Sequence, residues 1–227
     1  MNPLGEFLVH THYYSLVDKI AFVVIVILPV WIRNWDREAL SVYLILFGFY
    51  MLEISATAVV YIVPVEVGNS WFYNIIQVAQ LGITLYYFSD KLKSKRHKYF
   101  FHLTYILFLI SHISITTLIA GWLQLDIFAL VPMTAIVGLA ALDFLRESLA
   151  EVEDRPIYSP VFWFACATVI SNFGSVPITS LYFRIASFDI GLANQIWHIN
   201  DVLYGLWFLI PAIGLVWISR KTIPSYS

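Results

Sequence analysis

The 227-residue chain contains one cysteine, Cys166, and only 12% charged residues. A single cysteine excludes a disulfide within the chain and a zinc or iron–sulfur site built from this chain's cysteines alone. Soluble domains carry about a quarter charged residues, so the low charge argues against a soluble fold. The chain also lacks a P-loop, a G-x-S-x-G turn, histidine boxes and a kinase segment. These absences leave open whether the protein is an enzyme, but they favour a non-enzymatic role.

Apolar residues are what the chain has in excess. The sequence is 60% hydrophobic and 17% aromatic, with a mean hydropathy of +0.77. Seven apolar stretches follow one another, each close to the roughly 20 residues that a helix needs to cross a bilayer. The sequence therefore predicts an all-α, polytopic membrane protein in which residues 1–227 form a single seven-helix transmembrane domain. The expected spans are residues 15–32, 40–63, 71–88, 99–122, 127–145, 160–183 and 196–218.

Positive charge is distributed unevenly between the predicted loops. The run from Lys91 to Lys98 lies between the third and fourth stretches, and cytoplasmic loops of membrane proteins are rich in Lys and Arg. With this loop inside, only Lys19 and Arg184 of the 13 Lys and Arg residues fall outside. The N-terminus is then predicted outside and the C-terminus in the cytoplasm. The basic run indicates topology or contact with anionic lipid in the bilayer, and nothing in the sequence supports a nucleic-acid partner.

Several polar side chains fall inside the predicted spans, where they are costly and tend to face the bundle interior. Given the predicted topology, most of them lie in the outer half, and the spacing of three between Asn74, Gln77 and Gln80 places these amides on one helix face. The sequence predicts that they form one outward-facing polar cavity that binds a small ligand or protons. Its ionisable core would be Glu53, His112, His198 and Asp201, with amides from Asn74, Gln77, Gln80 and Asn172.

A structural explanation stands beside this one. Amides in membrane helices often only bond neighbouring helices, which applies to Asn74, Gln77, Gln80 and Asn172 taken singly. Glu53 is harder to explain in this way, because a lone carboxyl at mid-span is protonated, paired with another group or functional.

No cofactor is expected from these residues. Zinc or iron, if bound, would use His112, His198, Asp201 and Glu53, and a haem between the two histidines is a further alternative. Seven-helix hydrolases with intramembrane zinc carry an H-x-x-x-H pair in the last helix, whereas this chain has His198-x-x-Asp201. The topology matches that of rhodopsins and many receptors. Rhodopsins bind retinal through a lysine in the seventh helix. Retinal is not expected here, because the last span has no lysine before Lys221 at its inner end.

Three motifs open predicted helices: Asn69-Ser-Trp-Phe-Tyr-Asn74, Ser159-Pro-Val-Phe-Trp163 and Gln195-Ile-Trp-His-Ile-Asn200. In these motifs and in its layout, the chain resembles a group of small seven-helix bacterial membrane proteins whose activity is not established. The resemblance implies a location in the bacterial inner membrane. It implies no activity, cofactor or site residue.

Four functions remain open at the level of the sequence. The favoured one is sensing or binding of a small ligand or protons, with a signal passed to a separate partner at the loops 91–98 and 146–156. A small-solute or proton-coupled transporter, a metal-dependent intramembrane enzyme and a structural subunit of a membrane complex are the alternatives.

Overall fold

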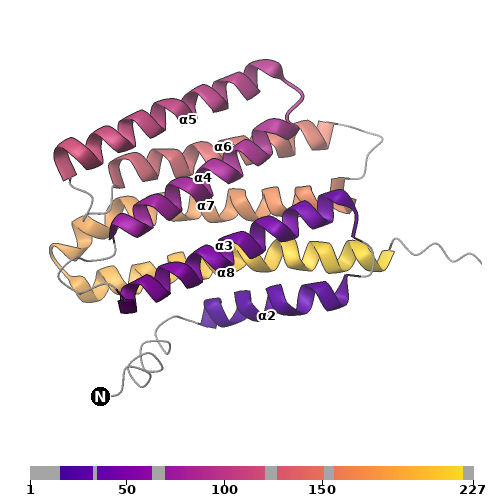
Figure 1. The fold of residues 1–227 in the computed structure, drawn as a ribbon, viewed down its shortest axis with the longest axis horizontal. Coiled ribbons are helices and arrows are strands. Elements are labelled where there is room, and N and C mark those ends of the chain that lie inside the picture. Colours follow the sequence, from indigo (N-terminus) through magenta and orange to yellow (C-terminus); the bar gives the residue numbers. More distant parts are fainter. Residues whose placement is uncertain (1–15, 33–34, 63–69, 121–126, 151–155, 222–227) are drawn as a thin grey trace, which may run out of the picture.

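The computed structural model describes residues 16–32, 35–62, 70–120, 127–150 and 156–221, and this part of the chain is all-helical. The prediction of an all-α fold is confirmed. The described residues form seven long α-helices, labelled as in Figure 1. They are α2 (Leu16–Trp31), α3 (Arg37–Ile62), α4 (Ser70–Lys91), α5 (Lys95–Ile115), α6 (Ile127–Ala150), α7 (Pro160–Ala186) and α8 (Ile190–Lys221).

Each expected span overlaps one helix, but several helices begin earlier than expected because polar side chains cap them. The Asp36 carboxylate accepts the Ala39 N–H at 2.6 Å before α3, and the Asp189 carboxylate accepts the Leu192 N–H at 3.0 Å before α8. Such caps satisfy amides that have no partner in the first turn of a helix. Some ends of the expected spans lie outside the described residues: Ser15, Val63 and residues 121–122.

The two loops expected to carry the cytoplasmic charges are shorter than expected. Helix α4 continues to Lys91, and α5 begins at Lys95 because the Ser94 hydroxyl accepts the His97 N–H at 3.3 Å. The basic run is therefore mostly helical, with Leu92–Ser94 as the connection. The expected loop 146–156 is helical as far as Ala150, its residues 151–155 lie outside the described part, and a 3-10 turn, η2, covers Pro156–Tyr158.

The helices lie side by side along one axis (Figure 1). The most extensive contact is between α7 and α8, followed by that between α6 and α7, and α2 packs on α8. Helices α3 and α4 cover this group, with α3 on α7 and α4 on α6. Helix α5 lies at one side against α4 and α6 and continues into a π-helical segment, η1 (Thr116–Ala120).

Four helical segments of the described chain are long and apolar enough to cross a membrane: Arg37–Ser55, Lys95–Leu118, Pro160–Tyr182 and Gly191–Arg220. They support a membrane protein. The described part of helix α2 has 16 residues, which at 1.5 Å per residue is shorter than a bilayer core of about 30 Å. Helix α4 carries the polar residues Asn74, Gln77 and Gln80.

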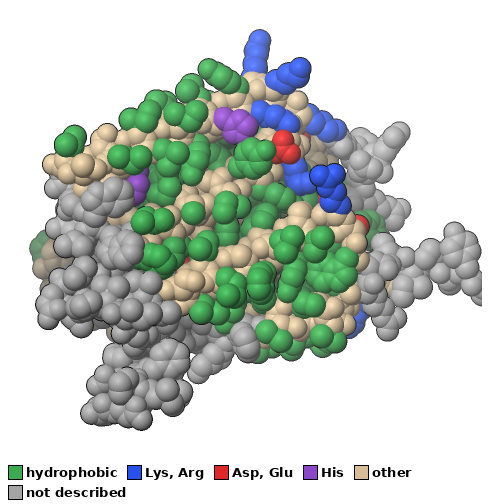
Figure 2. All heavy atoms as spheres, viewed as in Figure 1, with side chains coloured by type: hydrophobic (Ala, Val, Ile, Leu, Met, Phe, Trp, Pro, Cys, Tyr) green, Lys and Arg blue, Asp and Glu red, His purple; other side chains and the backbone are tan. Residues whose placement is uncertain are grey.

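The apolar surface of the bundle also suits a membrane. On α5, Leu103, Ile106, Leu107 and Ile110 are all exposed, so the helix presents an apolar stripe away from the bundle. Hydrophobic side chains cover much of the face in Figure 2, and Lys and Arg gather at one end. We call this the basic end, defined by Lys91, Lys93, Lys95, Arg96 and Lys98 where α4 passes into α5.

Aromatic packing fills the bundle on the side of the basic end. The side chains of Phe88, Phe164 and Phe208 are fully buried. The Phe88 and Phe164 rings are 5.3 Å apart, and the Phe164 and Trp207 rings are 5.4 Å apart. This aromatic layer joins α4, α7 and α8 across the core.

Glycines allow α8 to approach α7 closely. A Cβ atom added to Gly174 would lie 2.7 Å from Leu203, and one added to Gly214 would overlap Cβ and Cγ of Trp163. Small residues at helix contacts are the usual means of close packing in membranes, where a hydrophobic driving force between helices is missing. These two glycines therefore account for the extent of the α7–α8 contact.

Gly214→Ala should destabilise the protein by about 1–3 kcal/mol, because Trp163 or the helix must shift to admit the methyl group. The measurement is thermal unfolding of the purified protein in detergent. Gly48→Ala is the matched control, since a Cβ atom there meets nothing within 4 Å. Equal melting temperatures for the two variants would contradict the close α7–α8 contact.

Candidate functional site

A cavity of about 210 Å³ lies inside the bundle, between α3, α4, α6, α7 and α8. Its wall combines amides, hydroxyls and aromatic rings with a few aliphatic side chains. The polar lining residues are Gln77, Gln80, Thr84, Thr134, Thr168, Ser171, Asn172, Ser175, Thr179, Asn200 and Tyr204. The apolar ones are Phe49, Leu81, Leu130, Val131, Val137, Trp197 and Trp207.

The cavity lies between the middle of the bundle and the end opposite the basic end. On α7, which starts at the basic end, the lining begins at Thr168 and continues to Thr179. One helical turn closer to the basic end, Phe164 and Phe88 belong to the aromatic layer. The cavity is therefore closed on that side by packed rings, while Thr179 and Trp197 toward the far end are only half-buried.

Most of the lining hydroxyls use their proton within the bundle. The Thr84 hydroxyl donates to the Gln80 carbonyl at 2.8 Å, and the Thr134 hydroxyl donates to the Leu130 carbonyl at 2.9 Å. Because a hydroxyl has one proton and two lone pairs, these groups remain acceptors toward the cavity.

Hydroxyls at the contact between α7 and α8 also donate to backbone carbonyls. The Ser171 hydroxyl donates to the Leu203 carbonyl at 2.9 Å. The Thr168 hydroxyl donates to the Phe164 carbonyl at 2.8 Å and accepts the Trp207 indole N–H at 3.2 Å. The walls on these two helices are therefore held by their own hydrogen bonds.

Asn200 contributes a buried acceptor that the described protein does not satisfy. Its Oδ1 atom is buried and has no hydrogen-bond partner within the described residues. A buried amide oxygen without a partner costs about 1–3 kcal/mol, so such groups are rare in folded proteins. At the wall of a cavity, this oxygen is placed to accept a hydrogen bond from a bound molecule.

Glu53 reaches the cavity through Gln80. The Gln80 Nε2 atom donates to Glu53 Oε1 at 3.3 Å, which joins α4 to α3. Glu53 is half-buried and is not among the described lining residues, so its carboxylate lies one hydrogen bond behind the wall.

The other predicted site residues take different positions. Gln77, Gln80 and Asn172 line the cavity, whereas Asn74 is fully buried in α4 without being part of the described lining. His112 is buried on α5, its ring 5.7 Å from Phe108, and its carbonyl accepts the Thr116 hydroxyl where the π-helical segment begins. It is also outside the described lining.

His198 and Asp201 lie on an outward face of α8. Their side chains are paired at 3.4 Å and are 68% and 31% exposed. The expected convergence of Glu53, His112, His198 and Asp201 on the cavity is therefore not found in the described part of the chain. The reason is helical rotation: Asn200 and Tyr204 face inward, so positions 198 and 201 point elsewhere. Their roles in binding a ligand, protons or metal stay predictions.

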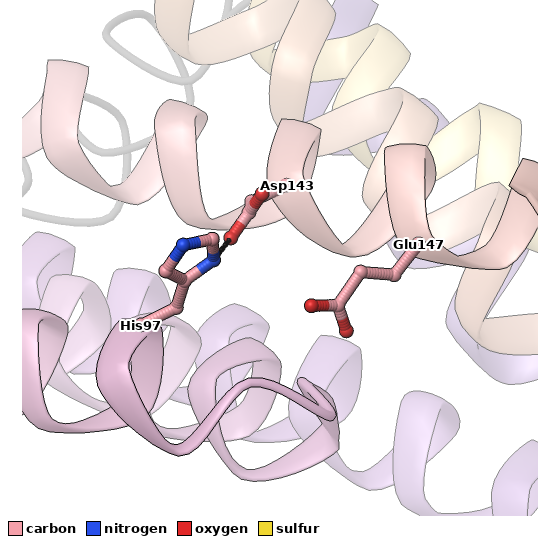
Figure 3. A group of neighbouring side chains, drawn as sticks. All are labelled: His97, Asp143 and Glu147. Carbon is pink, nitrogen blue, oxygen red and sulfur yellow. Dashed lines mark hydrogen bonds and ion pairs between the residues drawn. The ribbon is translucent and has the colours of Figure 1, made fainter.

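A second polar cluster, which the sequence reasoning did not predict, lies at the basic end (Figure 3). His97 of α5 bonds the Asp143 carboxylate of α6, which also pairs with Arg146 at 2.7 Å. Glu147, one turn further on, accepts the Lys93 N–H at 2.7 Å. The spacing of four between Asp143 and Glu147 was the available signal, since it places both carboxylates on one helix face.

His97, Asp143 and Glu147 hold ligand atoms within 4.8 Å of one another, which is close enough for a metal ion. Their bonds to Arg146 and to the Lys93 N–H already account for the arrangement. The cluster is therefore best described as a clasp between α5 and α6, which we call the α5–α6 clasp.

The sequence carries a polar stripe on α7 of which Asn172 alone was predicted as a site residue. Residues 168, 171, 175 and 179 recur at intervals of three and four, which places them on one face of a helix, with Asn172 beside them. Threonine and serine are common in membrane helices, where they often only bond neighbouring helices. Their periodicity was the missed signal.

Comparisons of this chain with protein-family models, curated proteins and solved structures gave no match. The resemblance to small seven-helix bacterial membrane proteins stays a prediction.

Asp143→Asn should destabilise the protein by about 1–2 kcal/mol, because one substitution weakens both the His97 and the Arg146 interactions. Thermal unfolding in detergent measures the loss, at about 2–4 °C per kcal/mol. Asp90→Asn, an exposed change at the same end, should move the melting temperature little. Matching shifts in both variants would argue against the clasp.

Proposed function

We propose that this chain is a seven-span membrane protein of the bacterial inner membrane that binds a small molecule in the bundle cavity and passes the occupied state to a cytoplasmic partner. The observation that carries the proposal is the cavity itself. It has about 210 Å³ of space between five helices, and its wall includes the buried acceptor of Asn200. Pockets for small molecules combine apolar walls with a few placed polar groups in this way.

The charge distribution supports the orientation with the N-terminus outside and the C-terminus in the cytoplasm. The residues of the basic end would then face the cytoplasm, as the positive-inside rule requires. The cavity lies toward the opposite end, so in this orientation its ligand would arrive from outside.

Binding accounts for the packing better than transport does. A transporter needs a path from the cavity to the cytoplasm, and the aromatic layer of Phe88, Phe164 and Phe208 fills that side of the bundle. The cavity wall offers no His, Asp, Glu or Lys in the described part of the chain, which disfavours acid–base or metal chemistry there.

Two prolines provide a means of relaying occupancy. Pro211 lies in α8 one turn beyond the lining residue Trp207, and Pro177 lies in α7 between the lining residues Ser175 and Thr179. A proline inside a helix removes a backbone hydrogen bond and weakens the helix locally. Both helices could therefore bend at the cavity, and α8 could carry the change to the basic end.

Ser175→Phe should abolish ligand binding, because the phenyl ring occupies the cavity. The measurement is a thermal-shift screen of small molecules on the purified protein, where a ligand at 100 times its Kd adds about 2.7 kcal/mol of stability. Ser180→Phe is the matched control, since Ser180 is an exposed serine on the same helix and is not part of the described lining. Ligands that stabilise both variants equally would rule out the cavity as the site.

The proposed orientation predicts opposite behaviour of two fusions at the C-terminus. Green fluorescent protein attached there should fluoresce, because it folds in the cytoplasm. Alkaline phosphatase attached there should be inactive, because it requires the oxidising periplasm for its disulfides. Active phosphatase combined with a dark fluorescent fusion would reverse the proposed orientation.

A further inference from the structure

The hydrogen-bonding character of the cavity wall indicates what kind of molecule fits. Thr84, Thr134 and Ser171 give their protons to backbone carbonyls, so their oxygens can only accept from a ligand. The Asn200 Oδ1 atom is a further acceptor, buried and without a partner in the described residues. These acceptors come from α4, α6, α7 and α8, which surround the cavity.

Two of the wall's donors are already engaged. The Trp207 indole N–H donates to Thr168 at 3.2 Å, and Gln80 Nε2 donates to Glu53 at 3.3 Å. A ligand that brings N–H or O–H donors would satisfy the acceptors, whereas one that brings only acceptors would leave them unpaired. Leaving buried acceptors unpaired costs more than forming their bonds gains.

Among the described residues, one charged group is linked to the cavity wall, and it is a carboxylate. The described lining includes no Lys, Arg or His, and the Glu53 carboxylate lies behind the lining residue Gln80, which donates to it. An anion would therefore meet no positive side chain on the wall, whereas a cation would have a carboxylate within reach of its field. Charge interactions are stronger in such apolar surroundings than in water.

Aromatic rings complete the wall and favour the same sign of charge. Phe49, Trp197, Tyr204 and Trp207 all line the cavity, and the Phe49 and Trp207 rings stack at 5.3 Å. The face of an aromatic ring attracts a cation, and the rings also pack against an apolar body.

We propose that the ligand is a small organic ammonium ion: a primary amine with an apolar or aromatic body. The inference rests on the proposed binding function. The ammonium group would donate its three protons to acceptors of this wall, Asn200 first, and the rings would pack against its body. The Glu53 carboxylate would balance its charge from behind Gln80.

The test uses three probes of nearly the same shape: 2-phenylethylamine as the cation, 2-phenylethanol as the neutral molecule and phenylacetate as the anion. Their binding to the full chain in nanodiscs is measured by calorimetry, with empty nanodiscs subtracted to remove partition into lipid. The amine should bind about tenfold tighter than the alcohol, and phenylacetate should bind weakest. Ser175→Phe should abolish binding of the amine, which locates it in the cavity.

Glu53→Gln should weaken the binding of 2-phenylethylamine about tenfold and leave that of 2-phenylethanol unchanged, because only the charge is removed. Glu38→Gln is the matched control on the same helix, since Glu38 pairs with Lys91 at the basic end. Retained binding of the alcohol shows that Glu53→Gln is folded. Where this variant does not fold, the wild-type ranking of the three probes decides.

The possible failures are distinct. Alcohol or phenylacetate binding as tightly as the amine would overturn the ammonium ligand, and so would a Glu53→Gln variant that binds the amine as the wild type does. If Ser175→Phe abolishes binding in either case, the cavity remains the binding site. Absence of binding by all three probes would also overturn the ammonium ligand, while the thermal-shift screen tests the binding function independently.

Discussion

The need to pair polar groups inside an apolar bundle governs the structure. In apolar surroundings there is little water to bond with, so a hydroxyl or amide forms its hydrogen bond with its own helix or with a neighbouring one. Thr84, Thr134 and Thr168 solve this locally by donating to the preceding turn. Gln80 solves it across helices by donating to Glu53. The cavity lies among these groups. Its buried acceptor, Asn200 Oδ1, receives no hydrogen bond from the described residues.

Close helix packing confines the space to one place. The glycines of α7 and α8 bring these helices together, and the aromatic layer fills the bundle toward the basic end. Polar side chains on α4 and α7 line the space that remains between the helices. At the basic end, the α5–α6 clasp ties α6 to α5, which lies at the side of the bundle.

Much of the fold could be predicted from the sequence because hydropathy acts locally. The apolar stretches overlap the helices of the described chain, and the basic residues gather at one end of it. Helix starts were less well predicted, since Asp36, Ser94 and Asp189 cap their helices a few residues outside the apolar stretches. A hydropathy pattern is insensitive to caps, which depend on single hydrogen bonds.

By itself, the sequence determined the helical class, the order of the helices and the end at which the basic side chains gather, because each follows from residues close together in the chain. It also supplied Gln77, Gln80 and Asn172 as cavity residues. Only the tertiary structure decided that Asn200 faces the cavity while His198 and Asp201 face outward, and that Glu53 lies behind Gln80. These outcomes depend on how each helix is rotated against its neighbours. That rotation is determined by packing between distant segments, such as Gly214 against Trp163, which no local pattern contains.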